Sequence, residues 1–199
     1  IEAKTIDAKS VPRDVVEKLL LMKDARVASL ARAQFGEMTP ATSAELHSQI
    51  DTMAATIRSG SGVPKPGKQI FESQCAKCHT LFGRGGKVGP DLTTFRRDDL
   101  DTMLLSIVNP NAEIREGYSS YLIATEDGRT LTGVLVDQDK NGVVIRGADG
   151  KDLALPRSEI AEMKASKTSI MPEGLLRGLD SQQVRDLFAY LRTTQPLID

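Results

Sequence analysis

The sequence of 199 residues is poor in cysteine, in net charge and in long hydrophobic runs, and each shortage excludes a class of protein. Its two cysteines, Cys75 and Cys78, are so close that a disulfide between them would close a tiny loop and stabilise the chain little. The formal net charge of −1 gives no support for nonspecific nucleic-acid binding, which depends on neutralising the phosphate charges. The longest apolar run, residues 19–22, is far shorter than the roughly 20 residues of a membrane-spanning helix.

The remaining composition is that of a globular protein. Hydrophobic residues make up 40% of the chain and charged residues 27%, which excludes disordered and collagen-like chains. At roughly 150 residues per domain, the length predicts one domain or one and a half. The chain opens Ile-Glu-Ala-Lys, without an initiator methionine or a short apolar stretch behind a basic start, so we interpret it as a mature protein or an excised piece.

Hydrophobic periodicity predicts helices at both ends of the chain. Residues 10–60 have apolar side chains at helical spacing, with a break near Lys23 and Asp24, and are followed by a linker rich in glycine and proline. Beyond the linker we predict three further helices, separated by loops and strands, at 68–75, 98–108 and 180–193.

The period becomes strand-like between Tyr118 and about Leu155. Three turn signals, Asp127-Gly128, Asn141-Gly142 and Asp149-Gly150, divide this segment. Three hairpin turns predict about four short antiparallel strands.

Chemistry is concentrated in Cys75-Ala-Lys-Cys78-His79, the C-x-x-C-H attachment motif of c-type haem. Two thiols at this spacing can each add to one haem vinyl group, and the adjoining imidazole then becomes the proximal iron ligand. A structural zinc site would need four ligands, for which only His47 remains. A thioredoxin-like thiol pair belongs at a helix start after a buried strand, whereas this motif follows a helical turn.

The sixth iron ligand would be a methionine or His47. Most methionines lie in or beside predicted helices, where methionine usually fills a core, and Met163 lies at a predicted helix edge. Met171 differs, because the segment Ser166–Pro172 is not helical and is fixed by a proline. A ligand-bearing loop is expected to look like this segment.

These motifs together resemble class I cytochrome c over residues 64–199. In that family a G-x-x-x-F/Y helix crosses an L-x-x-Y/W helix at the glycine, and the matching pairs here are Gly67 with Phe71 and Leu187 with Tyr190. Gly89-Pro90-x-Leu92 matches the G-P-x-L loop. The resemblance implies that the Pro90 carbonyl accepts the ring N–H of His79, and that Met171, followed by Pro172, is the axial methionine.

A narrower resemblance is to the haem-binding domain of large planctomycete and verrucomicrobial proteins. In them, such a domain is C-terminal to a dehydrogenase-like propeller or to helical repeats. The predicted fold is therefore mostly α, a class I cytochrome c fold with a small antiparallel β insertion and an N-terminal helical extension. We expect the extension or connector over 1–62 and the haem domain over 63–199, with the insertion at about 118–160.

The expected function is one-electron transfer by one covalent haem c, with iron bound by His79 and Met171. We expect an electron carrier rather than an enzyme, with a dehydrogenase module or another redox partner, in the periplasm or exported. One alternative is a gas-binding or weakly peroxidatic haem protein with a labile sixth ligand; another is an interaction module that docks through the β insertion. Three apolar residues are expected to pack around the haem: Leu92, Phe95 and Phe188. Four basic residues are candidates to pair with the haem propionates: Arg84, Lys87, Arg96 and Arg97.

Overall fold

The computed structural model describes residues 24–35, 43–166 and 168–198 and divides into two compact units, 1–47 and 48–199. Helix α2 (Ala25–Phe35) begins after Asp24, whose carboxylate accepts hydrogen bonds from the backbone N–H groups of Arg26 and Val27. Helix α3 (Ser43–Arg58) follows and includes residues of both units. The earlier part of the predicted N-terminal helices lies outside the described residues.

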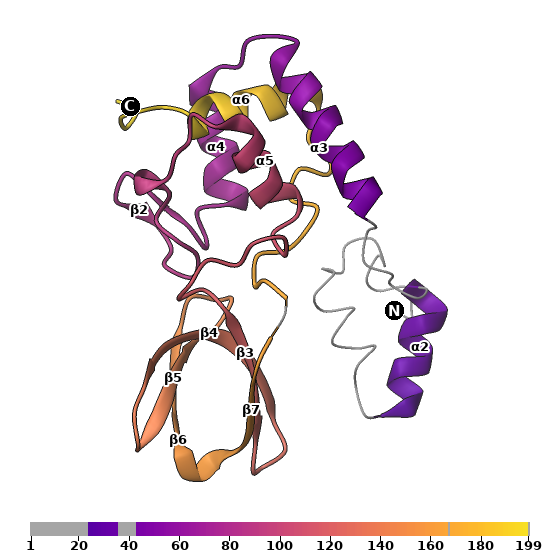
Figure 1. Cartoon of the computed structure of the whole chain (residues 1–199), viewed down its shortest axis with the longest axis vertical. Coiled ribbons are helices and arrows are strands. Elements are labelled where there is room, and N and C mark those ends of the chain that lie inside the picture. The colour runs from indigo at the N-terminus through magenta and orange to yellow at the C-terminus, as the bar shows by residue number, and fades with distance from the viewer. Residues whose placement is uncertain (1–23, 36–42, 167, 199) are drawn as a thin grey trace. The chain divides into compact units, whose positions relative to one another are not determined.

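Three helices of the second unit lie together (Figure 1): α4 (Pro64–Gln74), α5 (Leu100–Val108) and α6 (Ser181–Leu191). Two have acidic N-caps, because Asp99 accepts from the N–H of Thr102 and Asp180 forms a capping box with Gln183. All three helices were predicted. On α6 four apolar residues are buried: Val184, Leu187, Phe188 and Leu191.

Helices α4 and α6 cross in close contact. A Cβ atom on Gly67 would lie 1.9 Å from the carbonyl oxygen of Asp186, so only glycine allows this approach. The rings of Phe71 and Tyr190 pack 5.5 Å apart at the same crossing. The Asp186 carboxylate also accepts the N–H of Val63, the residue before α4, at 2.7 Å. The helix crossing expected from the resemblance is therefore confirmed.

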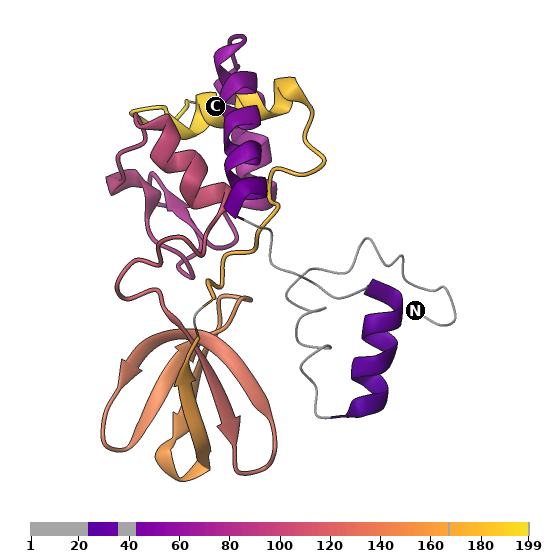
Figure 2. The ribbon, with the colours of Figure 1, turned by 45° about the vertical axis from the view of Figure 1, so that its right-hand side comes forward.

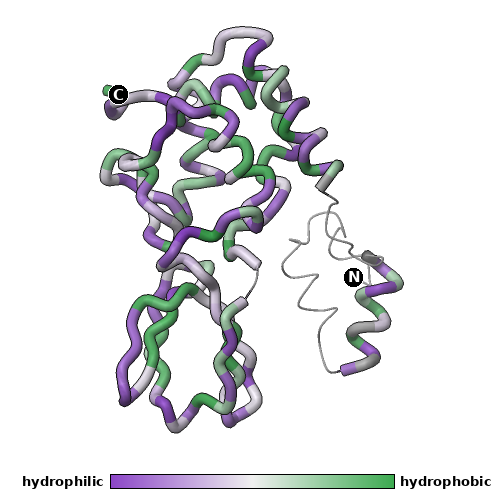
Figure 3. The backbone as a smooth tube through the Cα atoms, viewed as in Figure 1, coloured by the Kyte–Doolittle hydropathy of each residue, from purple (hydrophilic) through white to green (hydrophobic). Residues whose placement is uncertain are grey.

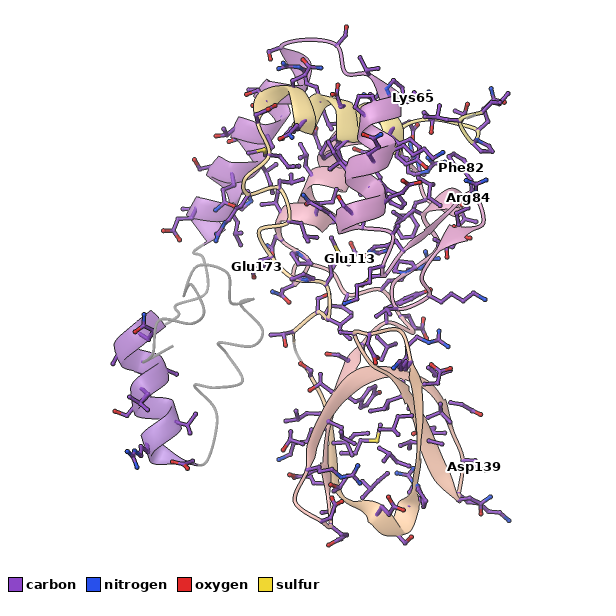
Figure 4. All side chains as sticks on the ribbon, turned by 180° about the vertical axis from the view of Figure 1, so that it is seen from behind. Lys65, Phe82, Arg84, Glu113, Asp139 and Glu173 are labelled. Carbon is purple, nitrogen blue, oxygen red and sulfur yellow. The ribbon has the colours of Figure 1, made fainter. Side chains whose placement is uncertain are left out.

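Residues 120–165 form a five-stranded antiparallel sheet with the order β6-β5-β4-β3-β7 (Figure 2). Its strands are β3 (Ser120–Thr125), β4 (Thr130–Gln138), β5 (Gly142–Arg146), β6 (Asp152–Pro156) and β7 (Ile160–Ala165), with a short 3-10 helix, η3 (Arg157–Glu159), before β7. Side chains fill the space that the curved sheet encloses (Figure 4). Ile123, Val143, Ile145 and Leu155 are the buried centre of this core.

The prediction of a mostly α protein is wrong. The five-stranded sheet has a hydrophobic core of its own, so the second unit contains a β module as well as its helices. The hairpin turns fall at the three predicted signals, but there are five strands rather than four, and the sheet extends to Ala165. Met163 is not at a helix edge: it lies in β7, pairs with Ile123 and packs against the sheet core.

Hydrophobic and hydrophilic residues are mixed along both the helices and the strands (Figure 3). Within the described ranges, every helix is too short or too polar to cross a membrane.

Candidate functional site

The C-x-x-C-H motif forms a compact turn directly after α4. The N–H groups of Cys75 and Ala76 both donate to the carbonyl of Phe71 and end the helix. The N–H groups of Cys78 and His79 then both donate to the carbonyl of Cys75, at 3.0 and 2.9 Å. Because the carbonyls of Phe71 and Cys75 each accept two backbone hydrogen bonds, the two thiols and the imidazole are held in a single turn. The thiols are not joined in a disulfide.

His79 is held by a hydrogen bond to the loop that follows the motif. Its Nδ1 lies 2.9 Å from the carbonyl oxygen of Pro90. Since a carbonyl can only accept, Nδ1 carries the proton and Nε2 keeps its lone pair. Burial lowers the pKa of His79, against the opposing effect of the Pro90 hydrogen bond, and so favours the neutral ring. A neutral, oriented imidazole with a free Nε2 lone pair is the form that binds a metal.

Gly89 lies directly against the His79 ring. A Cβ atom at this position would be 2.5 Å from Cε1 and 2.8 Å from Nδ1 of the ring. The Gly89 N–H also donates to the carbonyl of Cys78 at 2.8 Å, which joins the loop to the motif. The loop therefore fixes both the position and the orientation of the imidazole.

The two thiols are half-buried, and the pKa of each is raised. Burial raises the pKa of Cys75 to about 11, with a smaller effect from the neighbouring Cys78. Burial raises the pKa of Cys78 as well, although Lys77 opposes it. Redox-active C-x-x-C pairs have a lowered pKa at the attacking thiol. The setting of these thiols therefore argues against the thioredoxin-like alternative.

Met171 lies before α6 among residues 168–180, which are not helical, as expected. Its N–H donates to Ser169 Oγ at 3.1 Å, and the residue is half-buried. Asn111 fixes this segment from the turn after α5, accepting from the N–H of Ser169 at 2.7 Å and donating to Glu173 at 2.9 Å. These contacts define the path of the Met171 segment, and sequence reasoning missed Asn111.

The loop after Pro90 is held by a short network. Asp91 accepts from the N–H of Thr93 and begins the 3-10 helix η2 (Leu92–Thr94). The hydroxyl of Thr93 accepts the N–H of Phe82 at 2.7 Å and joins the two arms of the loop, a role that no sequence signal indicated. Of the residues expected to pack in a pocket, Phe188 is buried and Leu92 half-buried. Phe95 is 36% exposed and lies under the Arg115 guanidinium.

Among the four basic residues proposed as propionate partners, Arg97 stands apart. Lys87, Arg84 and Arg96 are exposed. Arg97 is half-buried, stacks 5.0 Å from the Phe82 ring centre, and donates from Nη1 to the carbonyls of Leu191 and Thr193. Its Nε is buried and has no hydrogen-bond partner in the part of the chain that the structure describes. A buried donor without an acceptor fits an anionic group bound from outside the chain.

His47, the other candidate sixth ligand, is exposed on α3. In the described ranges, no group of three or more His, Cys, Asp or Glu side chains is arranged to hold a metal ion.

In a comparison with known families, residues 64–139 match the Cytochrome c family. The matched span begins at the first residue of α4 and contains Cys75, Cys78, His79 and Pro90, while Met171 and α6 lie beyond it. No curated protein matches the chain. A cytochrome c domain implies haem c, electron transfer and a redox partner, and c-type cytochromes are usually exported or periplasmic.

Proposed function

We propose that this chain holds one covalent haem c between His79 and Met171 and carries single electrons from a dehydrogenase module to a further redox partner. The strongest support is the setting of His79, whose ring is oriented by Pro90, packed against Gly89 and placed one residue after Cys78. No acid–base pair or nucleophile is needed for this function, because the bound haem supplies the one-electron chemistry.

Each residue of the site has a separate task. Cys75 and Cys78 attach the haem through thioether bonds, and His79 Nε2 binds the iron. Pro90 keeps the proton on Nδ1 and makes the imidazole a more basic ligand. Arg97 Nε, buried and without a partner in the described structure, would donate to a propionate. Leu92, which is half-buried, and Phe188, which is buried, would provide apolar surroundings for the haem.

Met171 is proposed as the sixth ligand for two reasons. It lies outside any helix, and Asn111 holds its segment in place through Ser169 and Glu173. A thioether ligand favours ferrous iron and raises the reduction potential. It also closes the iron to external ligands, which distinguishes an electron carrier from a gas-binding or peroxidatic protein.

The Met171→Ala variant tests the function directly. The whole chain is produced in a host that attaches haem c, and covalent haem is verified on a denaturing gel. We expect the ferric wild type to show a sulfur-to-iron charge-transfer band that Met171→Ala lacks, and we expect the reduced variant to bind carbon monoxide far faster than the wild type does. Met163→Ala is the matched control, because Met163 packs inside the sheet, and it should keep the band.

A wild type that lacks the band and takes up carbon monoxide readily would contradict His79/Met171 ligation. It would favour the gas-binding or peroxidatic alternative. A wild type without covalent haem would contradict the proposed function as a whole.

Removing the Asn111 side chain is expected to loosen the Met171 ligand. In Asn111→Ala the Ser169 N–H and Glu173 lose their shared partner. One such hydrogen bond contributes about 1–1.5 kcal/mol, so the form with methionine released should become about tenfold more populated. Stopped-flow binding of carbon monoxide to the reduced protein measures this as faster uptake. Asn141→Ala removes a comparable side chain from the β4–β5 turn and should not change the rate.

The wider context follows from the narrower resemblance of the sequence. We propose that the chain works as a domain of a larger exported protein of the planctomycete type, in which a dehydrogenase-like part supplies the electrons. Covalent haem attachment outside the energy-transducing membrane supports this location.

A further inference from the structure

A three-way contact of Arg146 joins the sheet to the loop that holds His79. Arg146 ends β5 and Asp152 begins β6, and the two residues face each other across the hairpin. The guanidinium binds the carboxylate through two bonds, Nε to Oδ1 at 2.6 Å and Nη2 to Oδ2 at 2.8 Å. Only 22% of the Arg146 side chain is exposed. A bidentate, half-buried pair of this kind is rigid compared with a surface ion pair.

The remaining nitrogen of Arg146 points out of the sheet. Its Nη1 donates to the backbone carbonyl of Lys87 at 2.9 Å. Next to it in the loop, Val88 is 1% exposed, and the hairpin tip at Gly150 approaches the Val88 side chain. The β5–β6 hairpin therefore holds Lys87 by one charge-assisted hydrogen bond, and its tip at Gly150 lies near Val88.

The same stretch of loop contacts His79. Gly89 packs on the ring, and the carbonyl of Pro90 accepts its Nδ1 proton. Between the Lys87 carbonyl and the Pro90 carbonyl lie only three residues of backbone, of which Val88 is buried and Gly89 is bonded to Cys78. A shift of Lys87 therefore moves the acceptor of the His79 ring.

We propose that Arg146, held by Asp152, is a positioning residue for His79: the sheet fixes the Lys87–Pro90 segment and so sets the strength of the hydrogen bond from the imidazole to Pro90. This inference rests on the proposed function, since it assigns the inserted sheet a role in tuning the same site. The sheet would thereby help to set the reduction potential.

The direction of the effect follows from ligand basicity. A strong hydrogen bond from Nδ1 makes the imidazole a better donor to iron and stabilises the ferric form. Loosening the loop weakens this bond, so the ferric form loses stability and the reduction potential rises.

The test compares Arg146→Lys with wild type in the haem-loaded chain. Lysine keeps the charge but cannot form the bidentate pair and the Lys87 bond with the same geometry. We expect the ferric/ferrous equilibrium to shift about threefold toward ferrous, a rise of about 28 mV at 59 mV per tenfold for one electron. By NMR, the His79 ring N–H of the ferrous protein should exchange with solvent about tenfold faster.

Arg129→Lys is the matched control. Arg129 pairs with Asp127 at 2.7 Å in the β3–β4 turn, in the same sheet. It should change neither the potential nor the exchange of the His79 proton. Asp152→Asn, compared with Asp127→Asn, is the second variant pair and decides the question if Arg146→Lys does not fold. It should raise the potential and speed the exchange relative to its control.

Folded Arg146→Lys and Asp152→Asn proteins with unchanged potential and exchange would overturn the inference. Equal shifts in the Arg129 and Asp127 controls would overturn it too, because the effect would then belong to the sheet in general. If the wild type carries no covalent haem, the proposed function fails on its own. Exchange of the Gly89 amide, which donates to Cys78, then tests the Arg146 contact in the haem-free chain, and an unchanged rate overturns it.

Discussion

Replacing Gly67 with alanine is expected to lower the free energy of unfolding by about 3 kcal/mol, a cost typical of severe overpacking. The added Cβ would lie 1.9 Å from the carbonyl oxygen of Asp186 and 3.0 Å from the N–H of Leu187. Both are backbone atoms of α6, so no side-chain rotation relieves the clash and the two helices must separate. Chemical denaturation followed by circular dichroism measures the loss.

Gly60→Ala is the control for this prediction. A Cβ at Gly60 would meet only the flexible Arg185 side chain, at 3.4 Å. Its effect should remain within about 0.5 kcal/mol, as for most surface substitutions. If Gly67→Ala were as stable as Gly60→Ala, the close crossing of α4 and α6 would be wrong.

Gly89→Ala is expected to displace the His79 ring and so to disrupt the site. The ring atoms Cε1 and Nδ1 would lie 2.5 and 2.8 Å from the new Cβ, so the imidazole and the Pro90 carbonyl cannot both keep their places. We expect a loss of about 2–3 kcal/mol in stability. In the haem-loaded protein we also expect loss of the low-spin ferric absorption spectrum, while the thioether bonds of Cys75 and Cys78 remain.

The same substitution at Gly83 separates strain from contact. Gly83 has φ of +75° and no heavy atom within 4 Å of its ideal Cβ. Gly83→Ala should therefore cost about 1–2 kcal/mol, the penalty of a left-handed backbone, and leave the ferric spectrum unchanged. A normal spectrum in Gly89→Ala would contradict the contact between Gly89 and the His79 ring.

Local signals in the sequence predicted the parts of the fold that depend on near neighbours. Asp99 and Asp180 begin helices because their carboxylates reach N–H groups two or three residues ahead. Asp127-Gly128 and Asp149-Gly150 mark hairpin turns because Gly128 and Gly150 adopt a positive φ, which a tight turn requires, without help from the rest of the chain. Such features are readable wherever the interaction closes within a few residues.

The sequence did not predict strand β7, because this strand forms by pairing with residues that are distant in the sequence. Ile160 and Met163 are spaced three apart, as in a helix, and η3 replaces the turn signal that marked the earlier hairpins. The strand pairs with β3, about 40 residues earlier in the sequence, as at Met163 and Ile123. Tertiary pairing therefore overrode the local pattern.

The residues of the candidate site also fall into those that short sequence patterns identify and those that depend on distant partners. The motif Cys75–His79 and the partner Pro90 could be identified from short sequence patterns, and the structure has the hydrogen bond between His79 and Pro90. Asn111 and Arg146 could not, because their partners Ser169 and Lys87 are 58 and 59 residues away. A single asparagine or arginine carries no sign of a partner at that distance.

The sheet also shortens the path between the two proposed ligands. His79 and Met171 are 92 residues apart, but the N–H of Ser166 donates to the carbonyl of Ser120 at 2.7 Å, so the folded sheet closes its own ends. The chain that must be ordered to bring Met171 to the iron is then about half as long. Because each halving of a loop lowers its closure entropy cost by about 0.6 kcal/mol, a folded sheet makes the return of a released methionine about threefold more favourable. Residues added at the β4–β5 turn, where Asp139 lies (Figure 4), would leave that distance unchanged.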